Sequence, residues 1–148
     1  RLWWNDPDVA LLRDSLTETE VQFHAASILA SGGMLLAGDD LPRLSPQRLA
    51  MLHKLSPPTG KAAVFDPGFQ EGLLRHGGRD LLFLFNWGES VESLSVDVRG
   101  AAKAFDFWTD APVSLYGGHL LLELQPLTAR VFVLPVRGGK APAPSAGS

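Results

Sequence analysis

The 148-residue chain is 45% hydrophobic and 20% charged, which fits one buried core, or one small domain with part of another. Its net charge of −3, without a basic run, provides no electrostatic footprint for nucleic acid or an anionic membrane, so neither is an expected partner. The absence of cysteine excludes disulfides, thiolate metal sites and a cysteine nucleophile.

The chain opens with a dense aromatic and acidic segment, WWNDPD at residues 3–8. Pro7 fixes its own φ and pushes Asp6 out of the α region, so one interpretation is a tight turn whose carboxylates cap local amides. The other interpretation is a sugar site, because indole faces stack on sugar C–H groups while carboxylates accept hydrogen bonds from hydroxyls. In an extended segment Trp3 and Trp4 point opposite ways, so at most one of them lines a site.

A helix and a short strand are predicted next. Thr17, with Glu20 three residues later, forms a capping box that begins the helix, and Gly32 ends it. The apolar run MLL at residues 34–36 is typical of a strand buried on both faces. This order of elements predicts α/β architecture for the first third of the chain.

An acidic pair, Asp39 and Asp40, follows the predicted strand directly. Active sites of α/β proteins lie at such strand ends. The alternative is a capping turn before the next segment. Ser45 as N-cap and Pro46 at the first helical position then predict a second helix.

Beyond residue 56 the periodicity changes from 3.6 to two. Repeated Pro and Gly residues at 57–68 mark the boundary. The HGGRD segment at residues 76–80 predicts a hairpin turn. Short strands without intervening helices are predicted at residues 80–87, 92–98, 103–108, 119–126 and 129–136. This pattern indicates an antiparallel sandwich or barrel.

The predicted organisation therefore has three parts. Residues 1–56 are the α/β part, residues 57–137 an antiparallel β-sandwich, and residues 138–148 a disordered tail rich in Pro, Ala, Gly and Ser. The α/β part has too few elements to close a sheet and would leave a large apolar edge exposed. We therefore expect it to be the last part of a longer protein.

Aromatic residues of the β region allow two interpretations. Asn86-Trp87 and the FWT segment at residues 107–109 fit a carbohydrate-binding face. They fit core or inter-domain contacts better, because large aromatic residues at the strand ends of a small sandwich are more often packed. The four histidines lack metal-ligand spacing, and no GxGxxG, P-loop or GxSxG motif is present. Neither a metal nor a cofactor is expected.

The first third of the chain resembles a known family. WWNDPDVALLR, followed by LTETEVQFHAASILASGGMLLAGDDLPRLSPQRLAML, is similar to the end of the catalytic barrel in the α-galactosidase (melibiase) families of glycoside hydrolases. Those families have W-N-D-P-D at the end of the seventh strand, a helix with L-T-x-x-E, an eighth strand ending in D/N-D-L, and an S-P-x-x-x-x-x-L helix. A looser similarity to their C-terminal sandwich includes FNW at residues 85–87 and WTD at residues 108–110.

The resemblance implies the last strands and helices of a (β/α)8 TIM barrel followed by an antiparallel β-sandwich. It also implies a retaining glycosidase that acts on terminal α-linked galactose. The family's nucleophile lies on the fourth barrel strand and its acid/base follows the sixth. Both precede the W-N-D-P-D segment, so no catalytic residue is expected in this chain, and the chain alone is expected to be inactive.

The expected sugar contacts are Trp4 and Asp6, from the chemistry of the WWNDPD segment, and Asp8, Val9 and Gly38, which the resemblance implies. The second aspartate of the motif, Asp8, contacts sugar hydroxyls in the family, and Val9 adds a backbone or wall contact. Some members line the pocket with a serine at the position of Gly38, but a glycine offers no side-chain hydrogen bond. The aspartates that follow Gly38 are expected to brace the strand end. Expected partners are an α-galactoside substrate and the missing N-terminal part of the barrel.

Two alternatives stay open at this point. The sandwich is either a non-catalytic carbohydrate-binding or interaction module, or a structural element that braces the barrel and binds nothing. The sequence does not discriminate between α-galactose, α-N-acetylgalactosamine and other α-sugars, because the loops that contact the group at C2 lie upstream in the family.

Overall fold

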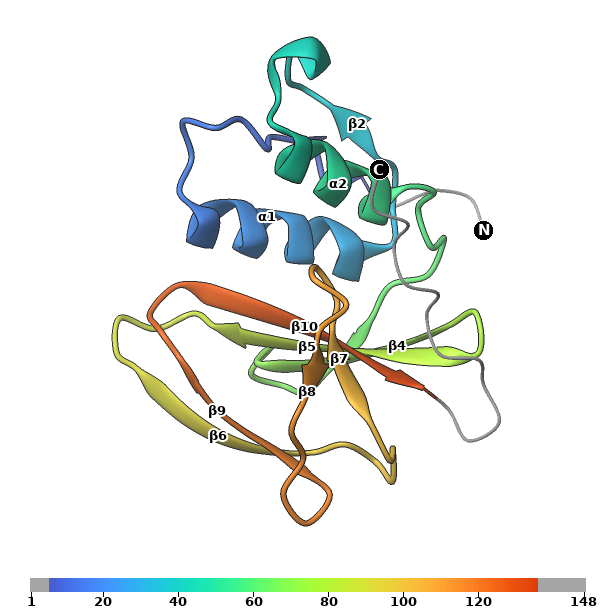
Figure 1. The fold of residues 1–148 in the computed structure, drawn as a ribbon, viewed down its shortest axis with the longest axis vertical. Helices are drawn as coiled ribbons and strands as arrows, with labels where there is room; N and C mark the ends of the chain where they lie inside the picture. Colours follow the sequence, from blue (N-terminus) through green and yellow to red (C-terminus); the bar gives the residue numbers. More distant parts are fainter. Residues whose placement is uncertain (1–5, 136–148) are drawn as a thin grey trace.

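The computed structural model describes residues 6–135 and arranges them in layers, with helices on one side of a large sheet and a small sheet on the other (Figure 1). The helical elements within these residues are α1 (Glu18–Ser31), the short 3-10 helix η1 (Leu41–Arg43) and α2 (Pro46–Leu55). No helix in this part of the chain is long and apolar enough to cross a membrane. The predicted tail at residues 138–148 lies outside the described residues.

The strands of residues 6–135 form three sheets. A parallel pair joins β1 (Val9–Ala10) to β2 (Leu36–Ala37), with α1 between them in the chain. The large antiparallel sheet has the order β3-β4-β5-β10-β7-β8, and its strands are β3 (Val64–Phe65), β4 (Glu71–His76), β5 (Arg79–Asn86), β10 (Thr128–Pro135), β7 (Ala104–Asp106) and β8 (Pro112–Val113). The small antiparallel sheet pairs β6 (Glu92–Asp97) with β9 (His119–Leu124).

Helix α1 begins and ends as predicted. The Thr17 N–H donates to Glu20 Oε2 at 2.8 Å, and Gly32 ends the helix in the left-handed region at φ 62°. The backbone N–H of Thr17, and then its hydroxyl, lower the pKa of the Glu20 carboxyl below its usual value of 4.5. Because the folded pKa is the lower one, this contact stabilises the helix above pH 4.5, and its contribution is lost as the pH falls through the lowered pKa.

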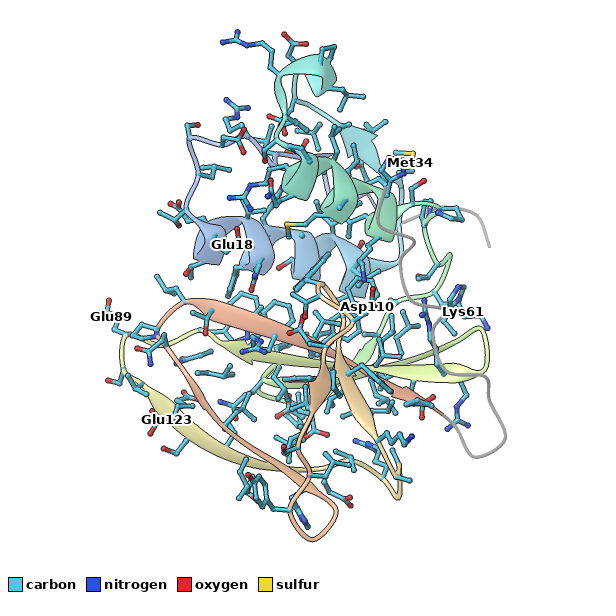
Figure 2. All side chains as sticks on the ribbon, viewed as in Figure 1. Glu18, Met34, Lys61, Glu89, Asp110 and Glu123 are labelled. Atoms are coloured by element: carbon cyan, nitrogen blue, oxygen red, sulfur yellow. The ribbon has the colours of Figure 1, made fainter. Side chains whose placement is uncertain are left out.

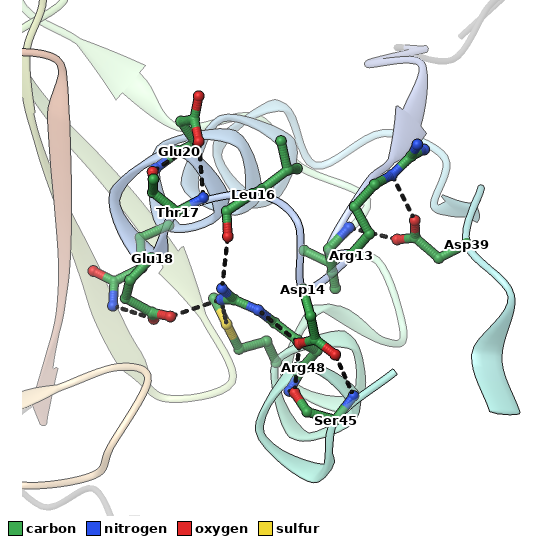
Figure 3. Close-up of polar contacts among 12 residues, drawn as sticks. Arg13, Asp14, Leu16, Thr17, Glu18, Glu20, Asp39, Ser45 and Arg48 are labelled. Carbon is green, nitrogen blue, oxygen red and sulfur yellow. Dashed lines mark hydrogen bonds and ion pairs between the residues drawn. The ribbon is translucent and has the colours of Figure 1, made fainter. Parts of the chain in front are cut away.

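Helix α2 also begins as predicted, with Ser45 as N-cap and Pro46 in the first turn. The Ser45 Oγ accepts the Arg48 N–H at 3.4 Å and donates to Asp14 Oδ1 at 2.8 Å. The buried Arg48 side chain donates from Nη1 to Glu18 Oε2 at 2.7 Å (Figure 3). These contacts tie the start of α2 to the start of α1.

The prediction of a strand buried on both faces at residues 34–36 is wrong in two respects. The strand β2 begins at Leu36, and both of its residues are exposed. Met34 and Leu36 are 41% and 52% exposed, and Figure 2 shows Met34 near β2 in the part of the molecule away from the sandwich. Within the described residues β2 pairs only with β1, so no second neighbouring strand covers it.

The large sheet is buried on both faces, and β5 shows why. Its odd-numbered Leu81, Phe83 and Phe85 lie in the core with the helices, whereas its even-numbered Leu82 and Leu84 lie in the core with the small sheet. Side chains of α1 complete the first core, namely Val21, Ala25, Ala26 and Leu29. The continuous apolar run of β5 therefore reflects cover from two sides.

The predicted antiparallel β-sandwich is confirmed. Predicted strands coincide with β5, β6, β7, β9 and β10, and Gly77 and Gly78 form the predicted β4–β5 turn with φ 61° and 76°. Strand β4 and the two-residue strands β3 and β8 were not predicted as separate elements. The predicted domain boundary at residues 56–57 stays a prediction, because the core between α1 and the large sheet is continuous across it.

Candidate functional site

The segment just before β1 forms a tight turn that is held by its own carboxylates. The Asp6 Oδ1 accepts the Asp8 N–H at 3.0 Å, and the Asp8 Oδ1 accepts the Val9 N–H at 2.9 Å. Both aspartates are exposed. The turn interpretation of this segment is therefore confirmed, and it leaves the sugar-site interpretation open because both carboxylates still face solvent.

Asp8 has an unusual backbone. Its φ of 68° lies in the left-handed region, which side chains other than glycine, asparagine and aspartate rarely adopt. Strain of this kind costs on the order of 1–3 kcal/mol and clusters at functional positions. Among the described residues only Oδ1 of this carboxylate has a hydrogen-bond partner, so Oδ2 is left to accept a hydroxyl. Asp8 is the residue of this segment best suited to bind an exposed polar ligand.

The strand that follows Asp8 is fixed from two sides. The His24 ring of α1 donates from Nε2 to the Val9 carbonyl oxygen at 3.0 Å, since a carbonyl only accepts. The Gly38 N–H donates to the Ala10 carbonyl oxygen at 3.0 Å. Helix α1 and strand β2 thus hold β1 in place, and with it the turn that carries Asp8.

Asp39 braces the strand end, as expected. Its carboxylate accepts the Leu12 N–H through Oδ2 and the Arg13 Nε at 3.2 Å through Oδ1 (Figure 3). Only 5% of the Asp39 side chain is exposed, so this aspartate is committed to the β1–β2 connection and not to a ligand. Asp40 precedes η1 as its N-cap residue and makes no side-chain capping bond, so a bracing role for it is not supported.

Gly38 and Val9, both expected to contact the sugar, lie against each other. A Cβ atom at Gly38 would lie 2.7 Å from Val9 Cγ2 and 3.0 Å from Leu11 Cδ2. The valine methyl groups therefore occupy the space where a side chain at Gly38 would begin. The remaining expected contact, Trp4, lies outside the described residues.

Gly38→Ser is expected to lower the free energy of unfolding by about 1–3 kcal/mol, because Val9 is too short and branched to move aside freely. The cost is expected to be smaller in a Val9→Ala background, where the obstructing methyl groups are gone. Urea unfolding of the protein, both single variants and the double variant gives the coupling energy. Strictly additive costs would show that the two residues do not compete for this space.

Asn86 lies in the core and Trp87 lies against helix α1, which favours packing contacts over a carbohydrate-binding face. Asn86 is fully buried, and its Nδ2 donates to the carbonyl oxygens of Ser90 and Leu124 at 2.7 and 3.0 Å. The Trp87 ring contacts Phe23 of α1 edge-on, with ring centroids 5.0 Å apart. Trp87 is nevertheless 51% exposed, so part of its surface has no cover within the described chain.

The 107–109 segment likewise contacts the α/β part. Lys54 of α2 donates from Nζ to the Phe107 carbonyl oxygen at 2.8 Å and to Asp110 Oδ2 at 2.7 Å. Asp110 lies in the β7–β8 loop, between the helices and the sheet in Figure 2. Trp108 is packed against the helical core. Phe107 is buried and Trp108 is partly buried, so these contacts favour a packing role for this segment over a carbohydrate-binding face.

The residue that sequence reasoning missed is His24. A lone histidine within a helix gives no local signal, because its partner Val9 lies 15 positions away. Groups of three or more His, Asp or Glu residues that could hold a metal do not occur within residues 6–135. A surface hollow of about 460 Å³ is lined by Arg75, Asp80 and Arg99 of the sandwich and includes none of the expected sugar contacts.

Comparison with protein-family models finds no match, and comparison with curated proteins finds none either. Solved structures do match. A GH27 β-L-arabinopyranosidase from Geobacillus stearothermophilus has a TM-score of 0.69 at 19% identity, over 93% of this chain and 38% of its own. α-Galactosidase I from Mortierella vinacea has a TM-score of 0.66 at 13% identity, over 88% of this chain and 39% of its own.

An α-galactosidase from Saccharomyces cerevisiae, solved with raffinose, has a TM-score of 0.62 at 13% identity, over 88% of this chain and 46% of its own. The expected resemblance is thereby confirmed as a likeness of fold. The chain spans less than half the length of each of these three structures. Within residues 6–135 the part before the sandwich is a β-α-β-α segment in which β1 is partly buried and β2 is exposed.

Proposed function

We propose that this chain is the C-terminal part of a retaining glycoside hydrolase that cleaves terminal α-linked galactose. The observation that carries the proposal is Asp8, an exposed carboxylate in left-handed backbone at the start of β1. It occupies the place of the second aspartate of the W-N-D-P-D motif. The fold shared with α-galactosidase structures supports the same proposal.

In this mechanism the residues of the chain bind and orient the substrate. The nucleophile and the acid/base are supplied by the remainder of the enzyme, where two closely spaced carboxyl groups give retention of configuration. Asp8 accepts hydrogen bonds from sugar hydroxyls through its free oxygen, while Oδ1 holds the turn. His24 and Asp39 act as positioning residues, since they fix the backbone at Val9 in β1 and at Leu12 just after it without reaching the sugar.

The test is an assay of the longer protein that contains this chain. We expect it to hydrolyse an aryl α-galactoside, and NMR of the first product to show the α-anomer of galactose, whereas this chain alone releases no aryl group. Parallel assays with aryl α-N-acetylgalactosaminide and aryl β-L-arabinopyranoside define the sugar. A native protein no larger than this chain, or a longer protein that binds galactosides without hydrolysing them, would overturn the proposal.

A further inference from the structure

An aromatic patch interrupts the polar surface of the described chain. It consists of Phe65, Phe69 and Trp87 and lies at the β3–β4 side of the large sheet. Phe69 is 62% exposed and Trp87 is 51% exposed, whereas Phe65 is half-buried. Contiguous exposed apolar side chains of this kind mark a surface that contacts another protein element, a membrane or a ligand.

The strand register places the aromatic patch on the same face of the sheet as the helices. Phe65 pairs with Gly72, and Gly72 pairs with Phe83, which lies in the core under α1. A Cβ atom at Gly72 would lie 2.5 Å from the Phe65 ring, so this ring lies directly over the strand. Trp87 follows Phe85 by two positions and stacks on it, with centroids 5.1 Å apart and 14° between the planes.

The aromatic patch continues the interface between α1 and the sheet. Phe23 of α1 contacts both Phe85 and Trp87 edge-on, at centroid distances of 5.3 and 5.0 Å. The Trp87 Nε1 donates to the Phe69 carbonyl oxygen at 2.8 Å, which fixes the indole and uses its only polar group. The exposed remainder of the patch is therefore apolar, rigid and adjacent to a surface that already packs a helix.

The other side of α1 is already occupied. Helix α2 contacts the loop after β7 through Lys54. In the sheet order β3-β4-β5-β10-β7-β8, strand β7 lies on one side of the central pair β5 and β10, and strands β3 and β4 lie on the other side. Helix α1 packs between them, against β10 and β5. Helices of consecutive βα units lie next to one another in chain order. The free position beside α1, over the patch, therefore belongs to the helix that comes before β1.

We propose that the aromatic patch is the docking surface of a second amphipathic helix, which lies beside α1 on the large sheet and precedes β1 in the same α/β layer. This inference rests on the proposed function, because it takes the β-α-β-α segment as part of a barrel. A sugar is the weaker occupant. The Trp87 N–H is already bonded, and the nearby Gln70 side chain is engaged with Glu92, so the patch offers few free polar groups to hydroxyls.

Hydroxyl-radical footprinting of the native protein from its source tests the docking surface. Oxidation rates, normalised to the intrinsic reactivity of each residue type, are expected to be at least several-fold lower at Phe69 and Trp87 than at Tyr116. Tyr116 is 61% exposed in the β8–β9 loop and serves as the internal reference. Equal normalised rates, or protection that appears only when galactosides or longer glycans are added, would overturn the inference.

A matched pair of substitutions gives a second readout. In the longer protein, Phe69→Ser is expected to lower Tm by roughly 3 °C or more, and Tyr116→Ser by much less. Phe69 has a left-handed backbone, which a small residue such as serine tolerates at least as well as a bulky one, so a loss of stability reports lost cover of the ring and not backbone strain. Equal shifts would contradict the inference. A longer protein that hydrolyses α-galactosides but leaves the patch open refutes this inference alone, whereas a covered patch without hydrolysis refutes only the proposed function.

Discussion

Asp8→Asn in the longer protein is expected to lower kcat/KM for an aryl α-galactoside by about 10- to 100-fold, the range for losing a hydrogen bond to a charged group. Asparagine has the same shape, also tolerates a positive φ, and keeps the oxygen that accepts the Val9 N–H. The turn before β1 is therefore expected to survive. The substitution removes the negative charge of the carboxylate to which a sugar hydroxyl donates its hydrogen bond.

Asp97→Asn is the matched control for this experiment. Asp97 is also exposed, and its Oδ1 accepts the Arg99 N–H two positions later, at 2.8 Å. Because it lies on β6 in the small sheet, its replacement is expected to leave kcat/KM unchanged. Thermal unfolding of both variants shows whether either change affects the fold. Normal kinetics for Asp8→Asn would refute the binding role of Asp8.

Gly32→Ala is expected to lower the free energy of unfolding by at least about 3 kcal/mol. The glycine has φ 62°, and a Cβ atom there would lie 1.9 Å from the Lys61 carbonyl oxygen and 2.3 Å from the Lys61 carbonyl carbon. Both obstructing atoms are backbone. They cannot move without parting α1 from the following segment, where the Ala63 N–H donates to the Ala30 carbonyl oxygen at 2.7 Å.

Gly100→Ala separates the two causes of this loss. Gly100 also has a left-handed backbone, at φ 77°, but a Cβ atom there would meet nothing within 4 Å. Its replacement is expected to cost about 1 kcal/mol, the backbone contribution alone. Urea unfolding of both variants, followed by circular dichroism, measures the difference. Equal losses would show that the contact with Lys61 is relieved by a small shift.

Features set by neighbouring residues were predictable from the sequence. Each helix cap depends on residues three positions apart, Thr17 with Glu20 in α1 and Ser45 with Arg48 in α2. The alternation of apolar and polar residues along β6 predicts that one face of this strand is buried. Contacts between distant segments were not predictable, because no local pattern encodes them. The bond from His24 to the Val9 carbonyl and the exposure of β2 depend on which elements meet in three dimensions.

The candidate site divides in the same way. The resemblance drew attention to Asp8, but its left-handed backbone is visible only in the structure. The absence of a side chain at Gly38 looked like a missing hydrogen bond in the sequence. In the structure, the glycine leaves the space that the methyl groups of Val9 fill, and this contact between two segments cannot be read from Gly38 alone.

The core shared by α1 and β10 has a consequence for synthesis on the ribosome. The apolar side of the helix, with Val21 and Ala25, emerges about 110 residues before Val131 and Val133 of the strand that buries it. At translation rates of about 5–20 residues per second this interval lasts roughly 5–20 s. The nascent helix therefore waits without its sheet, and chaperones have access to its apolar side until β10 joins β5 and β7 and closes the core.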